Sequence, residues 1–214
     1  MCLEKLLDYQ VRKLDFLELA DKELTELIAS LKTYIELIEK WGRVTNLTAV
    51  RDPLEMVTRH IIDSLSIMPY IKKTQEYILD VGTGAGLPGI PLSLALKDKK
   101  FTLLDSNLKK QIFLQHVVQT LHLQNVSLQC IRSEIYQSRT PFHTIVSRAF
   151  APLGKMLSLT EHLLAPQGRF LAMKGKIDSQ ELEGIGVNYK IEEIINFKQT
   201  QARHLIIVAR NHQG

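Results

Sequence analysis

The strongest chemical signal in this 214-residue chain is a glycine-rich segment, DVGTGAGLPG, at residues 80–89. It follows a short apolar run and precedes a helical pattern, which is where ligand-binding turns occur in α/β proteins. Glycines there let the backbone turn tightly and approach a ligand without Cβ clashes. The next expected strand ends in Asp105, whose carboxylate can accept hydrogen bonds from two ribose hydroxyls. Together these residues predict a site for a nucleoside cofactor.

Two cofactors fit this pattern. Gly84 to Gly89 match the G-x-G-x-x-G motif of dinucleotide binders, and Asp105 follows at about the usual 20 residues. Asp80, directly before the glycines, would repel a pyrophosphate, but it suits the ammonium of S-adenosylmethionine, which carries no phosphate. The pattern therefore favours a methyltransferase, with an NAD-dependent oxidoreductase as the alternative.

The rest of the chain after residue 70 predicts a mostly parallel sheet, because short apolar strands alternate with helical patterns. The expected strands are 77–81, 101–105, 126–130, 144–147 and 169–173, and the expected helices are 88–96, 108–121 and 153–164. Two closing strands, 189–197 and 204–209, have no clear helix between them and predict a hairpin. We therefore expect the class I S-adenosylmethionine-dependent methyltransferase fold, Rossmann-like with seven strands and an N-terminal helical extension.

That extension is expected because apolar residues recur at helical spacing in the first third of the chain. The clearest stripe runs from Leu24 to Ile38, with Asp21 expected as its cap and Gly42 as its stop. A weaker pattern covers 3–19, and a third helix is expected from Pro53 to about Met68. We expect two regions packed as one unit, the helical extension at 1–70 and the methyltransferase domain at 71–214.

The cysteine content, the N-terminus and the length of the apolar runs indicate where in the cell the protein acts. Only two cysteines occur, and we expect Cys130 to be a packed free thiol because it ends an apolar run. The N-terminus reaches charged residues at once, and no stretch has the ~18 apolar residues of a membrane span. These features predict a cytoplasmic protein without a membrane partner. No histidine or cysteine lies in a metal-binding motif, so we expect no metal.

Beyond the glycine turn, the chain resembles the bacterial 16S rRNA guanine-N7 methyltransferases, also called glucose-inhibited division protein B. The turn alone is shared by many methyltransferases, but the ordered set of flanking segments is far more specific. These are NLTAV at 46–50, RHIIDSL at 59–65, the extension of the turn through LPGIPL at 87–92, LDS at 104–106 with KK at 109–110, RSE at 132–134, SRAFA at 147–151, MKG at 173–175 and RHL at 203–205. The resemblance covers nearly the whole chain from about Leu24.

The resemblance implies methyl transfer from S-adenosylmethionine to N7 of one guanine in 16S rRNA, either as RNA or within the small ribosomal subunit. Because N7 already has a free lone pair, we expect no obligatory general base. By motif position, the resemblance implies cofactor contacts at Gly82, Leu87, Ser133, Glu134 and Arg148. The residue types add Asp80, Gly84, Gly86 and Asp105.

Five polar residues are candidates for the catalytic site, namely Asn46, His60, Arg148, Lys174 and Arg203. Three of them also have a plainer interpretation: Asn46 suits a turn cap, His60 a buried structural histidine, and Arg203 a phosphate or solvent contact. A non-catalytic RNA-binding assembly factor on the same scaffold is a third possible function. The complete glycine turn with Asp105 argues against it.

Charge is unevenly distributed along the chain. The formal net charge is +4, but residues 1–70 carry nine Lys and Arg against twelve Asp and Glu, a net −3. Residues 71–214 carry 18 against 11, a net +7. We therefore expect a basic, RNA-facing surface around the carboxyl ends of the strands, on a protein that acts as a monomer.

Overall fold

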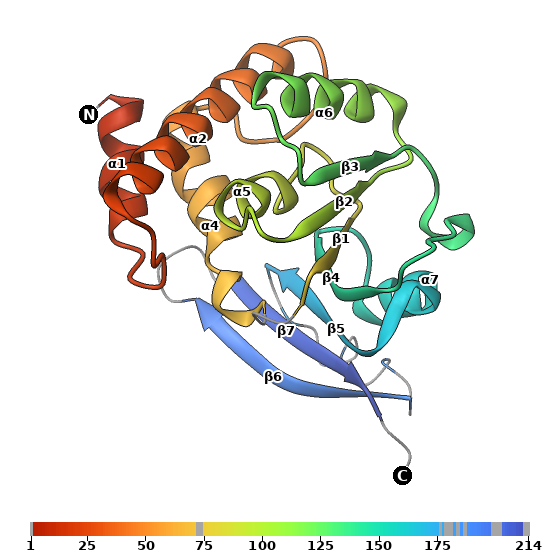
Figure 1. Ribbon diagram of the computed structural model, residues 1–214. Helices are drawn as coiled ribbons and strands as arrows, with labels where there is room; N and C mark the ends of the chain where they lie inside the picture. Colours follow the sequence, from red (N-terminus) through yellow and green to blue (C-terminus); the bar gives the residue numbers. More distant parts are fainter. Residues whose placement is uncertain are drawn as a thin grey trace.

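A seven-stranded sheet organises the molecule, with strand order β3-β2-β1-β4-β5-β7-β6 (Figure 1). The computed structural model describes residues 2–71, 75–175, 177, 182, 185, 188–197 and 203–211. The strands are β1 Tyr77–Val81, β2 Lys100–Leu104, β3 Val126–Gln129, β4 Phe142–Arg148, β5 Leu164–Lys174, β6 Tyr189–Phe197 and β7 Arg203–Arg210. The first five strands pair in parallel, and β7 runs antiparallel to both β5 and β6. The parallel sheet and the closing hairpin are thus confirmed.

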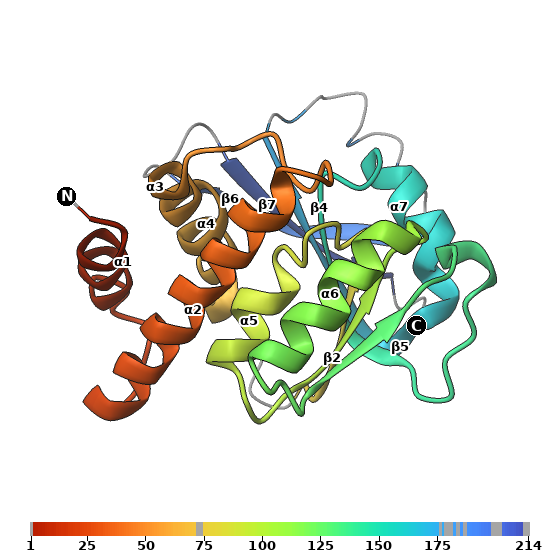
Figure 2. The same ribbon diagram turned by 90° about the horizontal axis from the view of Figure 1, so that it is seen from above.

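Helices cover both faces of this sheet. They are α1 Leu3–Arg12, α2 Asp21–Gly42, α3 Pro53–Met56, α4 Asp63–Leu65, α5 Gly89–Ala95, α6 Leu108–Thr120 and α7 Leu153–Thr160, with a π-helix, η1, at Val57–Ile62 and 3-10 turns η2 Met68–Tyr70, η3 Ser133–Ile135 and η4 Glu161–Leu163. α2, α5 and α6 lie on one side of the sheet and α7 on the other (Figure 2). Within the described residues, none of these helices has the length and apolar character of a membrane span.

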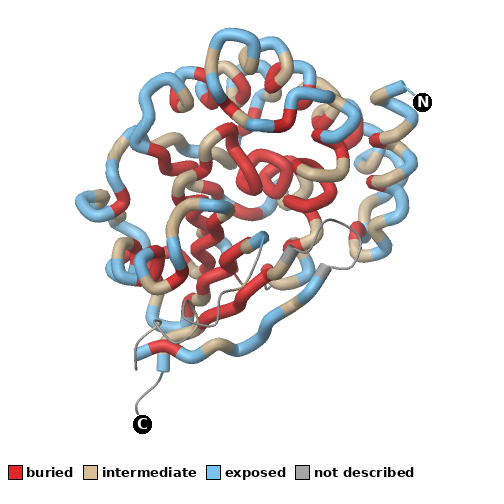
Figure 3. Tube along the Cα trace, turned by 180° about the vertical axis from the view of Figure 1, so that it is seen from behind, coloured by how far each residue is buried: buried red, intermediate tan, exposed pale blue. Residues whose placement is uncertain are grey.

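The helical extension shares its core with the sheet. One cluster of buried side chains joins Leu31 and Ile35 of α2 to Ile78 of β1 and Val146 of β4. A second cluster, on the opposite face, packs Met156 and other α7 residues against the alternate positions of the same strands. Figure 3 shows this buried interior enclosed by an exposed rim. Alternate residues of the central strands β1 and β4 are therefore buried on opposite faces, as in parallel sheets.

Two local expectations for the helices were wrong. Asp21 is the first residue of α2, and the N-cap is Ala20. The backbone N–H of Ala20 donates a hydrogen bond to Oε2 of Glu23 at 3.0 Å. The Asp21 carboxylate instead pairs with Arg12 at 2.7 Å. The helix expected at 3–19 is shorter than expected, since α1 covers only Leu3–Arg12.

The third helix begins at Pro53, as expected, and Asp52 caps it by accepting a hydrogen bond from the Leu54 N–H at 2.9 Å. Its central part is the π-helix η1, which its apolar spacing does not reveal. The expected burial of Cys130 was also wrong, since the thiol is exposed. β3 is an edge strand and ends at Gln129, so Cys130 lies beyond the pairing that would have buried it.

Candidate active site

The glycine-rich turn leaves β1 with three glycines in the left-handed region, Gly82, Gly84 and Gly86, at φ values of 66°, 62° and 95°. Other residues are strained there. Space is also short, because a Cβ on Gly82 would lie 2.3 Å from Cδ2 of Phe150. The N–H of Gly82 donates to the carbonyl of Leu104 at 2.8 Å, which ties the turn to the end of β2. Backbone conformation and packing thus both require glycine at Gly82.

Asp80 is fully buried beneath this turn. Its Oδ2 accepts hydrogen bonds from the hydroxyl of Thr83 at 2.6 Å and from the N–H of Gly89 at 2.8 Å. Its Oδ1 receives no hydrogen bond from any residue that the structure describes. Burial raises the pKa of Asp80 to about 7, although the two hydrogen bonds oppose this rise. Asp80 therefore fixes the turn and retains one unused acceptor at the end of β1.

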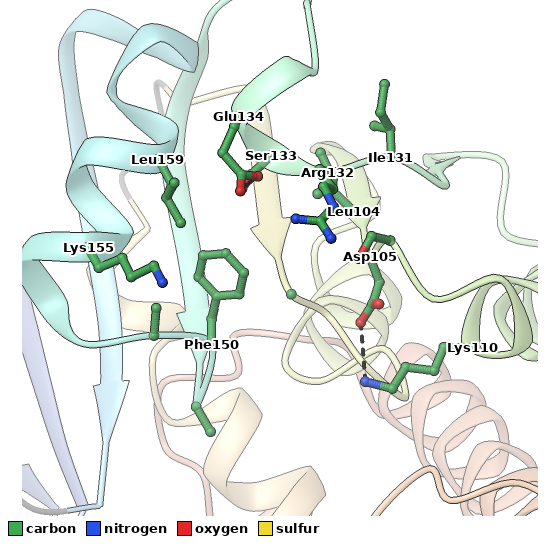
Figure 4. A pocket seen from close by; sticks show the side chains of 14 residues that line it. Leu104, Asp105, Lys110, Ile131, Arg132, Ser133, Glu134, Phe150, Lys155 and Leu159 are labelled. Atoms are coloured by element: carbon green, nitrogen blue, oxygen red, sulfur yellow. Dashed lines mark hydrogen bonds and ion pairs between the residues drawn. The ribbon is translucent and has the colours of Figure 1, made fainter.

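Asp105 lies just beyond β2 and faces the turn. Its Oδ2 accepts a hydrogen bond from the N–H of Gly84 at 3.0 Å and pairs with Nζ of Lys110 at 3.4 Å (Figure 4). Its Oδ1 accepts a hydrogen bond from the N–H of Asn107 at 2.9 Å. Since each carboxylate oxygen has two lone pairs, Asp105 keeps acceptor capacity for a ligand.

A cavity of about 440 Å³ opens beside Asp105. Its walls come from the turn after β1, the segments that follow β2, β3 and β4, and one side of α7 (Figure 4). The described residues that line it are Gly82, Leu104, Asp105, Ser106, Lys110, Ile131, Arg132, Ser133, Glu134, Ala149, Phe150, Ala151, Lys155 and Leu159. β1 lies between β2 and β4, where the strand order reverses. Ligands of open α/β sheets bind at this point, beyond the carboxyl ends of the strands.

The structure divides the predicted cofactor residues into two groups. Gly82, Asp105, Ser133 and Glu134 line the cavity. Glu134 accepts a hydrogen bond from the Ser133 hydroxyl at 3.0 Å, and backbone and Ser133 hydrogen bonds lower the pKa of this carboxyl.

The second group lies behind the cavity wall. Leu87 is buried and Gly86 packs against Ile90 and Leu114, so both support the turn from behind. Gly84 reaches the site through its hydrogen bond to Asp105.

Two strand-end cations, Arg148 and Lys174, are not among the described residues that line the cavity. Nη1 of Arg148 donates hydrogen bonds to the carbonyl of Arg59 at 3.1 Å and to Oδ2 of Asp63 at 3.2 Å. Nζ of Lys174 donates to the carbonyl of Ala151 at 2.7 Å. Both cations therefore hold backbone around the site.

The other three candidates are Asn46, His60 and Arg203. Asn46 is exposed between α2 and α3 and accepts a hydrogen bond from Arg51 at 3.5 Å. His60 is buried in η1, with Nε2 2.8 Å from the Thr48 hydroxyl. Neither is among the described residues that line the cavity. Arg203 begins β7, but its side chain is outside the described part of the structure.

Four residues that line the cavity were not predicted as site residues, namely Lys110, Arg132, Phe150 and Lys155, although the first three lie in segments that carry the family resemblance. A signal existed for Lys110, because its place five residues after Asp105 puts it in the first turn of α6. The residue type of Phe150 gave no indication of its contact with Gly82, which depends on the pairing of β4 with β1.

The donor set fits S-adenosylmethionine better than a dinucleotide. Carboxylates follow or end three neighbouring strands, at Asp80, Asp105 and Glu134. Asp80 in particular holds a buried acceptor oxygen directly under the turn, where a pyrophosphate would need N–H donors and no negative charge. A ribose and a cationic amino-acid group can use such acceptors. In the described part of the chain no three potential ligand side chains gather as a metal site.

Comparison with solved structures agrees on the fold. A S-adenosylmethionine-dependent methyltransferase from Aquifex aeolicus matches with a TM-score of 0.55 and 14% identity, over 83% of this chain and 97% of that one. The glycopeptide N-methyltransferase MtfA, solved with S-adenosylmethionine, matches with a TM-score of 0.58 and 9% identity over 70% of this chain and 93% of its own. The fold is thus the class I S-adenosylmethionine-dependent methyltransferase fold.

Sequence comparison is more specific. The family model described as rRNA small subunit methyltransferase G matches residues 27–206. Proteins named ribosomal RNA small subunit methyltransferase G from Salmonella arizonae and Salmonella typhi are each 41% identical over 198 residues, which is 91% of this chain and 93% of theirs. Because the family model and these relatives match nearly the whole chain, the relatives at 41% identity, the chain belongs to the rRNA small subunit methyltransferase G family.

Proposed function

We propose that this protein transfers the methyl group of S-adenosylmethionine to N7 of one guanine in 16S rRNA. The observation that carries the proposal is the cavity between Gly82 and Asp105 at the carboxyl ends of β1 and β2, in a chain of this family. Its volume of about 440 Å³ is within the usual range for small-molecule sites.

The residues around the cavity have distinct roles toward the cofactor. Asp105 lines the cavity just beyond β2, and the remaining lone pair of its Oδ1 accepts a hydrogen bond from a ribose hydroxyl. Ser133 and Glu134 supply polar contacts from the segment after β3. Asp80 stabilises the turn and offers its unused Oδ1 as an acceptor beneath it. S-adenosylmethionine, when bound, supplies the electrophilic methyl carbon.

Guanine N7 needs no deprotonation, so positioning is the main task of the protein. Holding two reactants in line can supply roughly 7–11 kcal/mol of the barrier reduction. The ring of Phe150 is half-buried in the cavity wall beside Gly82, where it offers an apolar face next to the cofactor. Positive charge passes from the cofactor to the base during transfer, and a π face is attractive to such charge.

The target guanine must leave the interior of any RNA helix. N7 lies in the deep, narrow major groove of A-form RNA, which side chains do not read. We therefore place the target in a loop or in a flipped-out position. Lys110, Arg132 and Lys155 line the cavity and provide cations for phosphate oxygens or for guanine O6.

The test uses 16S rRNA from a strain that lacks this gene. Borohydride reduction and aniline treatment cleave RNA at N7-methylguanosine. We expect a single cleavage site after incubation with the protein and S-adenosylmethionine, and no site without the protein. Continued N7 methylation at the same guanine in the deletion strain would refute the proposal.

The two alternatives predict different results. An oxidoreductase would show saturable micromolar binding of NADH and no binding of S-adenosylmethionine. An assembly factor would bind the RNA or the small subunit without methyl transfer. The experiment also compares naked 16S rRNA, a precursor particle and the complete subunit as substrates.

The setting of the reaction is part of this proposal. We place the protein in the cytoplasm, acting as a monomer on 16S rRNA or on the small subunit. Sedimentation equilibrium at micromolar concentration tests the oligomeric state, and a mass of twice the monomer would contradict it.

A further inference from the structure

The contact between Arg148 and Asp63 joins two parts of the chain that are 85 residues apart. Only 2% of the Asp63 side chain and 14% of the Arg148 side chain is exposed. The two groups are 3.2 Å apart, and the same guanidinium nitrogen also donates to the carbonyl of Arg59. Charge-assisted hydrogen bonds of this kind are about twice as strong as neutral ones. This contact is too well buried to be a surface ion pair of little effect.

Both acceptors of Arg148 belong to the π-helix η1 or follow it directly. η1 covers Val57–Ile62 and ends directly before Asp63. π-helical turns are rare and frequently occur at functional sites. The carbonyl of Arg59 and the carboxylate of Asp63 both face the end of β4, where Nη1 of Arg148 meets them. The helical extension therefore has a two-acceptor anchor for the end of this strand.

The anchor holds one wall of the cavity. Arg148 is followed by Ala149, Phe150 and Ala151, which we call the wall segment, and all three residues line the cavity. Phe150 packs so closely on Gly82 that a Cβ there would meet its ring. At the other end of the wall segment, Lys174 donates a hydrogen bond to the carbonyl of Ala151. The wall segment is thus held on both sides by buried or half-buried cations.

The backbone of the wall segment needs such support. Ala149 has a φ of 55°, in the left-handed region that residues other than glycine rarely adopt. Conformations of this kind persist only where the surrounding structure imposes them. Arg148, which precedes Ala149 at the end of β4, is held in place by its hydrogen bonds to Arg59 and Asp63.

We propose that Asp63 is a positioning residue for the cofactor site. Through Arg148 it holds the wall segment against Gly82, and in this way it sets the affinity for the cofactor. Asp63 is not among the described residues that line the cavity, so its effect passes through Arg148. The inference rests on the proposed function, because it requires the cofactor to occupy this cavity.

The test compares Asp63→Asn, Arg148→Gln and the double variant in the full-length protein. Asparagine has the shape of aspartate, so the first variant removes the charge without leaving a void. Affinity for the product S-adenosylhomocysteine is measured by calorimetry, and KM and kcat are measured for both substrates. Hydrogen exchange by mass spectrometry follows a peptide that covers the wall segment. Glu192→Gln is the matched control, because it disrupts the partly buried Arg169–Glu192 pair, 3.3 Å apart and outside the cavity lining.

We expect Asp63→Asn to weaken S-adenosylhomocysteine binding about tenfold, the equivalent of ~1.4 kcal/mol. KM for S-adenosylmethionine should rise while KM for the RNA stays within twofold. Exchange in the wall segment should become faster, and the double variant should bind no more weakly than Arg148→Gln. The control should change none of these quantities.

Three results would overturn the inference. The first is unchanged product affinity and exchange in Asp63→Asn, even if its Tm falls, because Asp63 would then be only structural. The second is a loss of kcat at unchanged affinity, because Asp63 would then act on the RNA or the chemical step. The third is a double variant whose loss of S-adenosylhomocysteine affinity equals the product of the losses in the two single variants, because Asp63 and Arg148 would then act independently. If the wild type binds no S-adenosylhomocysteine, the proposed function itself fails.

Discussion

The hydroxyl of Tyr34 lies 2.7 Å from the carbonyl oxygen of Ala85 and donates a hydrogen bond to it. Tyr34 is on α2 and fully buried, whereas Ala85 is in the middle of the glycine turn. Burial raises the pKa of Tyr34 well above its usual value, so the phenol keeps its proton and remains a donor. Through this bond the helical extension supports the cofactor turn from behind.

Tyr34→Phe should therefore destabilise the protein by ~1–3 kcal/mol, because it leaves the buried Ala85 carbonyl without its donor. Urea unfolding measures this change. Tyr9→Phe is the control, since Tyr9 is 54% exposed on α1. Equal unfolding midpoints for the two variants would show that the Tyr34 hydroxyl does not stabilise the turn.

Asp105→Ala should weaken binding of S-adenosylhomocysteine by ~10–100-fold, the range expected when hydrogen bonds to a charged group are lost. The substitution removes the acceptor for the ribose and also the acceptor that orders Gly84 and Asn107. Calorimetry measures the affinity. Asp98→Ala, which removes an exposed carboxylate near Lys99, is the control. Unchanged affinity in Asp105→Ala would show that the ribose assignment is wrong.

The stability of the protein should depend on pH through Asp80. Its pKa is about 7 in the folded protein against 3.8 for the ordinary group, because burial disfavours the charged form. Its contribution to stability is therefore complete below about pH 4 and is lost as the pH rises through about 7. The difference corresponds to at most ~4 kcal/mol.

Asp80→Asn should accordingly gain stability relative to the wild type between pH 5 and pH 8. Urea unfolding at each pH unit measures the two free energies of unfolding. Asp98→Asn, at an exposed position, is the control. A constant difference between Asp80→Asn and the wild type over this pH range would contradict the prediction.

Binding to 16S rRNA should weaken with added salt, because phosphate contacts release counterions. Lys155→Gln should reduce the slope of log K against log salt by about one if Lys155 contacts one phosphate. Fluorescence anisotropy with labelled RNA from 50 to 200 mM salt gives the slope. Lys13→Gln is the control, because Lys13 follows α1 and is not among the cavity residues. Equal slopes in both variants would place the RNA elsewhere.

Local patterns sufficed to predict most of the sheet. β1 and β6 have the expected bounds, because each is a short run rich in β-branched and aromatic residues, YILDV and YKIEEIINF. β5 begins five residues before the expected start, at Leu164. Leu164 was expected to end the helix at 153–164. It instead pairs with Phe142 of β4, and an irregularity in the pairing accommodates the residues between Leu164 and Arg169. The exposure of Cys130 depends on strand order, which apolar runs do not encode.

The candidate site was predictable only where one short segment carries the signal. Gly82, Asp105, Ser133 and Glu134 were expected as cofactor contacts and do line the cavity, although their binding role stays a prediction. The contacts of Arg148 with Asp63 and of Tyr34 with Ala85 join residues 85 and 51 positions apart. These contacts form because the helical extension packs on the sheet, and a local sequence pattern does not predict them.

The central place of β4 in the sheet affects how the chain assembles during synthesis. β1, β2 and β3 are synthesised first, and β4 then pairs with the free side of β1, bringing Asp80 opposite Val146. Until β4 emerges, β1 presents a row of unpaired backbone groups, which is a site for aggregation or chaperone binding. The wall segment that follows β4 and the α7 side of the cavity are made later still. A nascent chain truncated before residue 142 is therefore expected to be both aggregation-prone and unable to bind S-adenosylmethionine.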